Sequence, residues 1–418
     1  MERTGMLLSE QSKTIALLGS LDTKADEMMY AKALIEHSGC TCLIIDMSTG
    51  CLSNKQSDIS PYQLLGKSGI SEEAFEKLNK PGKIESMRKA VEHTLLDLYL
   101  QNRFDGVLSI GGGQNARMAA EAMKKLPFGV PKLLASPLIC GNRTLEQYVG
   151  TKDMMVVHTV ADTEGLNMVT KTVIQNICNA MTGMVAGKKP IAAGENRIRV
   201  AVSALGITSE GVRGICTGLP EETFETTCFH ANGVGGRCME ELLDEDAFDL
   251  VVDMTLHEIT CELLGGYCTG ANGRLLKAVE KEIPMIVVPG AVDMIDYYVE
   301  KEAEVSEILQ DRSFVYHNSS VIHAKIRKDE VLLLAETIAE RLNRGKAPTT
   351  VILPHGGFSS ESAPDAPLYS PDIDEAFIGK MKELLKKEIR IIEIEGNINS
   401  LECQNTILKE IIKIKSKI

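Results

Sequence analysis

One stretch, residues 104–124 (FDGVLSIGGGQNARMAAEAMK), limits what this chain can fold into more than any other. An apolar run ending at Ile110 is too short for a helix and stops at three glycines, Gly111, Gly112 and Gly113. A segment rich in Ala and Met follows, so the pattern predicts a strand, a tight turn and a helix. The glycines let the backbone approach a ligand, and the free amides at a helix start favour phosphate or carboxylate.

The same alternation of short apolar runs and helical segments continues along the whole chain. Further strands are predicted over residues 14–19, 41–47, 131–136, 155–159, 198–206, 224–230, 250–254, 285–290, 350–354 and 389–394. Helices are predicted between many of them, over residues 26–38, 71–78, 83–101, 166–185 and 238–244. Such alternation is typical of parallel sheets with right-handed crossovers.

A chain of 418 residues is too long for one ordinary core, and residues 187–197 have the composition of a linker. We therefore predict an α/β fold of two Rossmann-like doubly wound domains, residues 1–190 and 198–418, with mainly parallel sheets. Strand ends of two such domains would face an interdomain cleft, where ligands of open α/β sheets bind.

The composition of the chain limits the classes of binding partner and the compartment that we expect. The net charge of -13 argues against a nucleic acid or an anionic membrane as the main partner. Residues 1–13 lack a secretory apolar region, and no stretch reaches the length of a membrane span. The 11 cysteines form no Cys-x-x-Cys pair, which favours reduced thiols in a cytoplasmic protein.

The first half offers two candidate ligand sites besides the three glycines. Residues 19–24 (GSLDTK) follow the first strand, and a lysine with two hydroxyls suits phosphate; the candidates are Gly19, Ser20, Asp22, Thr23 and Lys24. This is neither a dinucleotide fingerprint nor a Walker A loop, and simple helix capping is the alternative. A second group places a hydroxyl, a cation and a carboxylate together before a strand: Thr151, Lys152 and Asp153. Its alternative is a surface turn.

The second half repeats the glycine signal. In residues 231–237 (ANGVGGR), Gly233, Gly235 and Gly236 precede Arg237, whose guanidinium is a fork-shaped anion donor. Together with the first glycine turn, this run predicts a ligand with two anionic groups held between the domains. Tight strand–helix packing is the alternative.

Acid–base groups also concentrate in the second half, and the catalytic candidates are His230, Asp253, Glu258 and Asp293. Residues 257–262 (HEITCE) are not His-Glu-x-x-His, so no zinc-protease helix and no metal site are predicted. Glu258 and Glu262 lie one helical turn apart and are interpreted as a solvated face.

Several motifs resemble one known family. They are residues 19–24, 110–113, 148–153 (YVGTKD), 161–167 (ADTEGLN), 230–241, 288–294 (VPGAVDM), 353–359 and 363–371. The chain resembles an uncharacterised two-domain family of bacteria and fungi that includes the N-terminal ATP-binding domain of the tomato mosaic virus resistance protein. The resemblance implies Rossmann-like subdomains, ATP binding and a homodimer. The chain departs from the family pattern at Gln114–Asn115 and at His257.

The sequence thus predicts a nucleotide-binding protein of unknown physiological role, with ATP, and possible Mg²⁺, held by the glycine-rich turns. An enzyme acting on a small phosphorylated or carboxylated substrate, with acid–base residues from the second domain, is the alternative. A protein-interaction module is a third hypothesis. Whether the chain is an enzyme stays open at this point.

Overall fold

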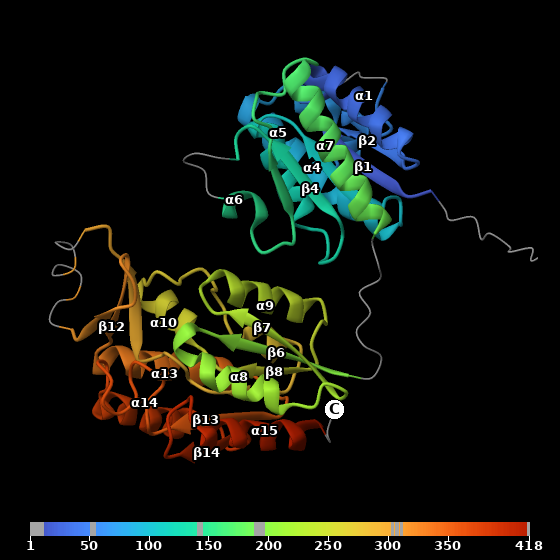
Figure 1. Ribbon diagram of the computed structural model, residues 1–418. Helices are drawn as coiled ribbons and strands as arrows, with labels where there is room; N and C mark the ends of the chain where they lie inside the picture. Colours follow the sequence, from blue (N-terminus) through green and yellow to red (C-terminus); the bar gives the residue numbers. More distant parts are fainter. Residues whose placement is uncertain are drawn as a thin grey trace, which may run out of the picture. The chain divides into compact units, whose positions relative to one another are not determined.

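The structure is a computed structural model that describes residues 12–50, 56–139, 145–187, 197–301, 305, 309 and 312–415. The chain divides into two compact units, Met1–Ile191 and Ala192–Ile418. Each is an α/β domain with its own sheet and its own core (Figure 1).

The N-terminal domain is built on a five-stranded sheet in the order β2-β1-β3-β4-β5. Every pairing in it is parallel. The strands are β1 (Thr14–Gly19), β2 (Thr41–Asp46), β3 (Gly106–Ile110), β4 (Lys132–Ser136) and β5 (Met155–His158). Most of their side chains are buried because helices cover both faces of the sheet.

Alternate residues of β1 divide between the two layers of this core. Ile15 and Leu17 pack with α1 (Leu21–His37) and α7 (Met168–Ala186). Ala16 and Leu18 pack on the opposite face with α4 (Lys80–Leu100) and α5 (Gly113–Met123). The shorter helices α2 (Pro61–Lys67) and α3 (Glu72–Glu76) lie with α4, and α6 (Glu146–Val149) contacts α5.

The C-terminal domain contains a six-stranded parallel sheet in the order β14-β13-β9-β8-β6-β7. Its strands are β6 (Ile198–Ala204), β7 (Phe224–His230), β8 (Leu250–Asp253), β9 (Met285–Val287), β13 (Thr349–Pro354) and β14 (Arg390–Ile394). One face packs on α8 (Ser209–Gly218) and α15 (Leu401–Lys415). The other packs on α9 (Val234–Asp244), α10 (His257–Leu264), α11 (Leu276–Glu280), α13 (Lys328–Asn343) and α14 (Pro371–Leu384).

A small antiparallel sheet joins this domain. Its strands are β10 (Met294–Tyr298), β12 (Val321–Lys325) and β11 (Phe314–Tyr316), in that order. The sequence analysis did not predict it. Its strands are only three to five residues long, and polar residues such as Asp296 and His323 are buried in them beside apolar ones, so no period of two marks them in the sequence.

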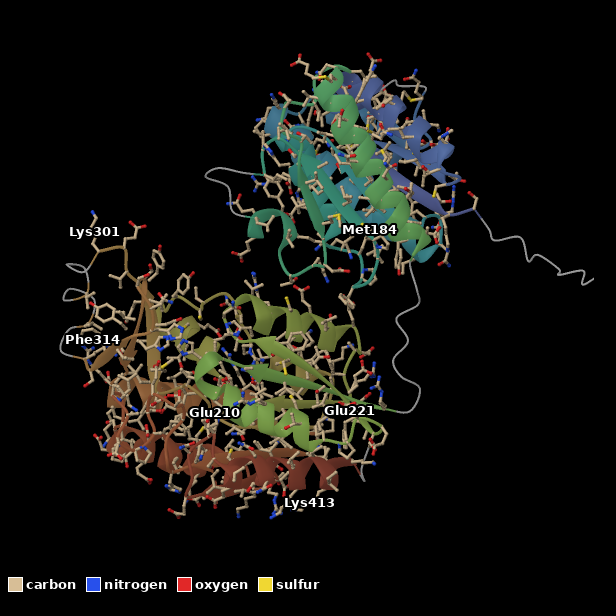
Figure 2. All side chains as sticks on the ribbon, in the orientation of Figure 1. Met184, Glu210, Glu221, Lys301, Phe314 and Lys413 are labelled. Atoms are coloured by element: carbon tan, nitrogen blue, oxygen red, sulfur yellow. The ribbon has the colours of Figure 1, made fainter. Side chains whose placement is uncertain are left out.

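The predicted fold class, two doubly wound α/β domains with mainly parallel sheets, is confirmed. The helix expected over residues 26–38 begins formally at Leu21, but Lys24 has φ -131° and ψ 30°, so the first turn is distinct from the rest. The amphipathic C-terminal segment docks on the sheet as α15, with Ile407 and Ile411 buried and Lys413 at the surface (Figure 2). Among the described helices, none is long and apolar enough to cross a bilayer.

Candidate functional site

The strand order of the N-terminal domain reverses between β1 and β3. The chain runs from β1 to its neighbour on one side, β2, and then crosses to β3 on the other side. In open parallel sheets, the loops at such a reversal leave a crevice at the carboxyl ends of the strands, and ligands bind there. The sequence motifs after β1 and β3 both lie at this edge.

A direct contact joins the two motifs. The hydroxyl of Ser20, just after β1, lies 3.2 Å from Oδ1 of Asn115, which is buried in the first turn of α5. The Asn115 amide also donates to Oγ of Ser109 at 3.2 Å, at the end of β3. A Cβ at Gly111 would overlap the Asn115 side chain, so this position requires glycine. The structure therefore connects the turn at residues 19–24 to the glycine turn at residues 111–113 through Asn115.

The two helices at this edge differ in how their N-termini are satisfied. The first amides of α1 are already bonded: Leu21 donates to Oδ1 of Asp46 at 3.0 Å, and Asp22 donates to Oγ of Ser48 at 3.0 Å. The N-cap of α5 is Gly112, which has no side chain to cap the helix. Within the described chain, the amides of Gly112, Gly113 and Gln114 have no hydrogen-bond partner. The positive end of the α5 dipole is therefore open.

A cavity of about 1140 Å³ adjoins the first turns of α5. Gly113, Gln114 and Arg117 line it from α5, and Arg88 lines it from α4. Arg88 is neutralised by Glu85, with Nε and Oε2 2.8 Å apart. Arg117 is exposed and makes no ion pair with any described residue. Glu121 also lines the cavity, and it pairs with Lys124 at 3.0 Å. The cavity thus combines open helix amides with a guanidinium that forms no ion pair among the described residues, which suits an anion.

Asp46 adds a buried carboxylate at the end of β2. Its Oδ1 accepts hydrogen bonds from the amides of Leu21 and Ser48 and from the Ser48 hydroxyl. Its Oδ2 is buried without a hydrogen-bond partner among the described residues. Burial raises the pKa of Asp46, and the bonds from Ser48 and Leu21 oppose that shift. The sequence marked Asp46 only as the end of a strand.

Asp153 is not brought to this edge. It precedes β5 and pairs with Lys132, the first residue of β4, with Nζ and Oδ1 2.7 Å apart. Its other oxygen accepts from the amide of Gly129 at 2.9 Å. Because the strands are parallel, residues before a strand lie at the opposite edge from the glycine turns. Thr151, Lys152 and Asp153, predicted as a second candidate ligand site, therefore lie at the opposite edge from the glycine turns, and Asp153 is an ion-pair partner of Lys132.

In the C-terminal domain, the predicted glycine-rich anion site holds a carboxylate of the protein itself. Oε1 of Glu258 accepts hydrogen bonds from the amides of Gly233 at 2.6 Å and Gly236 at 3.0 Å, at the start of α9. Gly235 lies against the backbone of His230, where a Cβ would overlap the carbonyl. Glu258 is fully buried, so its interpretation as part of a solvated face was wrong.

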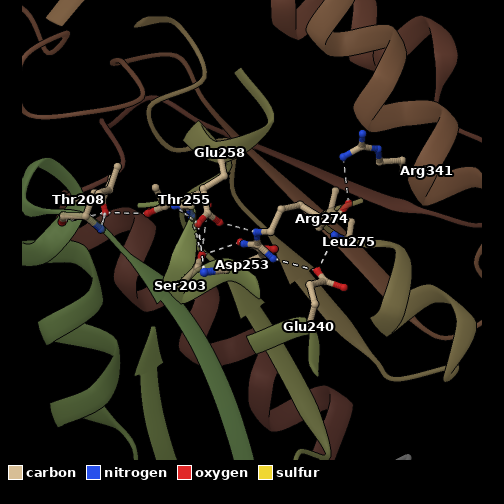
Figure 3. A network of polar contacts seen from close by, with 12 residues as sticks. Ser203, Thr208, Glu240, Asp253, Thr255, Glu258, Arg274, Leu275 and Arg341 are labelled. Carbon is tan, nitrogen blue, oxygen red and sulfur yellow. Dashed lines mark hydrogen bonds and ion pairs between the residues drawn. The ribbon is translucent and has the colours of Figure 1, made fainter. Parts of the chain in front are cut away.

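Arg274 pairs with this carboxylate and with two others (Figure 3). Its guanidinium is fully buried and lies 2.8 Å from Oε2 of Glu258, 2.7 Å from Oδ1 of Asp253 and 3.1 Å from Oε1 of Glu240. Ser203, at the end of β6, donates to the same Asp253 oxygen at 2.5 Å. Two of the catalytic candidates, Asp253 and Glu258, are therefore members of a closed ion-pair network.

The other candidates of this domain are dispersed. Asp293 is buried and accepts from Nζ of Lys325 at 2.6 Å, and Lys325 also contacts Asp374 at 3.0 Å. His230 is exposed at the carboxyl end of β7, and Arg237 is half-buried in the first turn of α9. The structure does not gather these side chains around one reacting position.

A histidine pair beside the small sheet could also hold a metal. The rings of His317 and His323 stack with centroids 4.6 Å apart, and Nδ1 of His323 lies 2.6 Å from Oε2 of Glu361. One possible ligand atom from each of the three residues lies within 4.8 Å of the other two. Exposed His317 and half-buried Glu361 also suit an ordinary surface ion pair.

Comparison with known proteins places the whole chain in one group of relatives. The two domain models of an uncharacterised protein family, UPF0261, match residues 13–190 and 197–415. A UPF0261 protein of Clostridium tetani is 31% identical over 409 residues, covering 97% of this chain and 100% of that protein. The ToMV resistance protein Tm-1(GCR237) of Solanum lycopersicum is 28% identical over 433 residues. This match covers 97% of this chain and 56% of the tomato protein. A UPF0261 protein of Brucella suis is 26% identical over 399 residues, covering 95% and 94% of the two chains.

Proposed function

We propose that the N-terminal domain of this chain, which belongs to the uncharacterised protein family UPF0261, binds a nucleotide. The phosphates of the nucleotide lie at the N-terminus of α5 in this proposal. The observation that carries the proposal is the set of open amides at Gly112, Gly113 and Gln114, since Gly113 and Gln114 line a cavity of about 1140 Å³. Backbone amides and a helix dipole bind phosphate without any particular side-chain motif. This explains how the site can lack both common phosphate-loop sequences.

Two cations complete the phosphate site. Arg117 lines the cavity one turn along α5, and its guanidinium can form paired hydrogen bonds to phosphate oxygens. Lys24 lies in the turn after β1, which the Ser20–Asn115 contact joins to α5. A Cβ built at Gly112 meets nothing within 4 Å, so there is room for a ligand against the backbone.

The remainder of the cavity suits a base and a sugar. Ile84 and Met118 line it with apolar atoms, and Leu138 and Tyr148 line it at the end of β4 and on α6. Apolar and aromatic walls with a few polar groups are usual for cofactor pockets. ATP is the first candidate, because the sequence motifs resemble those of an ATP-binding family member. Closure by the second domain across an interdomain cleft stays a prediction.

An enzyme that uses acid–base residues of the C-terminal domain has less support. Asp253 and Glu258 are buried and neutralised by Arg274, so they do not meet a substrate. A small phosphorylated or carboxylated metabolite at α5 remains the competing ligand, since it shares the anionic group.

The test is calorimetric titration of the full chain with ATP, ADP, AMP, inorganic phosphate and a sugar phosphate, with and without Mg²⁺. Arg117→Ala and Lys24→Ala should each weaken ATP binding by about 1.5–3 kcal/mol, the range for a charged hydrogen-bond partner. Arg213→Ala, at an exposed arginine of α8, is the matched control and should not change affinity. Unchanged affinity in both test variants would remove this site. Heat from a metabolite and none from ATP would favour the enzyme alternative.

We also propose a cytoplasmic homodimer. All nine cysteines that the structure describes are free, which suits a reducing compartment. The prediction of a homodimer comes from the family resemblance. Light scattering of the purified chain, at two concentrations and with ATP, measures the mass of the assembly directly.

A further inference from the structure

A cluster of metal-ligand side chains lies in the C-terminal domain, outside the network of Arg274. His257 and Cys261 stand one turn apart on α10, Cys268 follows that helix, and Asp296 lies on β10. Nε2 of His257 is 3.2 Å from Oδ1 of Asp296. Sγ of Cys261 is 3.3 Å from that nitrogen and 2.9 Å from that oxygen. One ligand atom each of His257, Cys268 and Asp296 falls within 4.8 Å of the other two.

The orientation of His257 suits coordination. Its Nδ1 lies 3.0 Å from the carbonyl oxygen of Ala291, to which it can donate its proton. Nε2, on the other side of the ring, is then the nitrogen that would hold a metal ion in the cluster. Histidine ligands of metals ordinarily donate their second ring proton to a carbonyl or carboxylate in this way.

The cluster is closed to solvent. His257 is 1%, Cys261 0%, Cys268 8% and Asp296 2% exposed. Gly266 lies directly over it, because a Cβ there would come within 2.5 Å of Sγ of Cys261 and 2.9 Å of Oδ1 of Asp296. A site without a side open to water is typical of structural metals, whereas catalytic metals keep one position open.

A nucleophilic Cys–His–Asp arrangement is a poorer account of the same residues. Reactive cysteines are partly exposed and have lowered pKa values. Cys261 and Cys268 are both buried, so neither thiol is accessible to an external substrate.

We propose that His257, Cys261, Cys268 and Asp296 form a closed structural site for one zinc-like divalent ion. One imidazole nitrogen, two thiolates and one carboxylate oxygen are the donor types and the number that tetrahedral zinc takes. The ion replaces one proton on each thiol, so binding releases protons. It ties α10 to β10 and thereby attaches the small antiparallel sheet to the domain. The site is independent of the nucleotide site on α5.

The experiment is elemental analysis of the full chain after dialysis, together with cobalt substitution of the metal. The wild type should retain about one zinc per chain, and its cobalt form should show a thiolate-to-cobalt charge-transfer band with intense tetrahedral d–d bands. Cys261→Ser and Cys268→Ser should each lower metal affinity at least tenfold and weaken the thiolate band. Cys403→Ser, at a buried cysteine of α15 in the same domain, is the matched control and should keep both signals.

Asp296→Asn is the second variant, in case the cysteine variants fail to fold, since it preserves shape and one oxygen. It should fold, retain the thiolate–cobalt band and bind zinc more weakly. A wild-type chain without zinc that also fails to bind added zinc or cobalt would overturn the proposal. So would metal that stays bound with unchanged affinity in Cys261→Ser and Cys268→Ser.

Discussion

The two domains share one order of parallel strands and differ at the edge where such sheets bind ligands. In the N-terminal domain, α5 begins at an uncapped glycine and adjoins a cavity. In the C-terminal domain, the glycine turn before α9 holds Glu258, which Arg274 neutralises. A glycine-rich turn therefore indicates that a backbone can accept a carboxylate or phosphate. It does not indicate whether that anion comes from a ligand or from the protein.

The largest expected effect comes from removing Arg274, the cation at the ligand-binding edge of the C-terminal sheet. We call this the closed edge, because the protein's own Glu258 occupies its glycine turn, and we call the edge at α5 the open edge. Arg274→Met leaves Asp253 and Glu258 buried without their partner and should destabilise the C-terminal domain by about 3–5 kcal/mol. Urea unfolding followed by hydrogen-exchange mass spectrometry of each domain measures it, and peptides of the N-terminal domain should be unchanged. Arg213→Met, at an arginine whose side chain is 72% exposed, is the control. Equal losses in the two variants would mean that the network does not stabilise this edge.

The second prediction tests whether removing the Glu258 carboxylate creates an anion site at the closed edge. Glu258→Ala frees the amides of Gly233 and Gly236 and should cost about 2–3 kcal/mol. Formate or acetate should restore part of the loss, because either ion can return a carboxylate to the α9 N-terminus and to Arg274. Thermal unfolding with and without formate measures the rescue.

Glu262→Ala is the matched control for that rescue. Glu262 lies on the same helix and pairs with Arg341 at 2.9 Å, but it does not contact the glycine amides. Its loss of stability should not respond to formate. Equal rescue of the two variants would show a general salt effect instead of a vacated anion site.

The sequence predicted the difference between the two domains only in part. Periodicity located most strands, because parallel strands buried on both faces read as short apolar runs. The helix start at α5 followed from the three glycines. Glu258 was assigned to a solvated face because spacing within one helix does not reveal what packs against it. Its partners Gly233 and Arg274 lie 25 and 16 residues away in sequence.

Arg117 and the cluster at His257 were missed for the same reason, because their surroundings come from distant parts of the sequence. Arg117 had no signal beyond its place after the glycines. Its importance depends on the pairing of the nearby carboxylates, because Glu85 pairs with Arg88 and Glu121 pairs with Lys124. The cluster at His257 joins α10 to β10 across 35 residues of chain. Its ligands follow no short spacing motif, and β10 itself was not predicted. Contacts between distant segments decide these assignments, and no local pattern encodes them.

A pair of glycine substitutions sharpens the contrast between the two edges. A Cβ at Gly236 would overlap the Glu258 carboxylate, so Gly236→Ala should destabilise the C-terminal domain by about 1–3 kcal/mol. A Cβ at Gly112 meets nothing within 4 Å, so Gly112→Ala should change stability by less than about 0.5 kcal/mol. It should nevertheless weaken ATP binding, because the methyl group occupies space beside the open amides. Unfolding and calorimetry on both variants check this, and strong destabilisation by Gly112→Ala would contradict an open edge.

The smallest expected effect concerns the buried carboxylate at the open edge. Burial raises the pKa of Asp46 above its unfolded value. Its contribution to stability is therefore present at low pH and is lost as pH rises through the folded pKa. Asp46→Asn should remove this dependence, so its stability relative to the wild type should increase from pH 4 toward neutrality. The gain should be of order ~1 kcal/mol or less, because Oδ1 keeps its bonds from Leu21 and Ser48. Thermal unfolding across that pH range measures it, with exposed Asp26→Asn as the control. Parallel curves for Asp46→Asn and wild type would mean that Asp46 is solvated, and hence that this edge is more open than the structure shows.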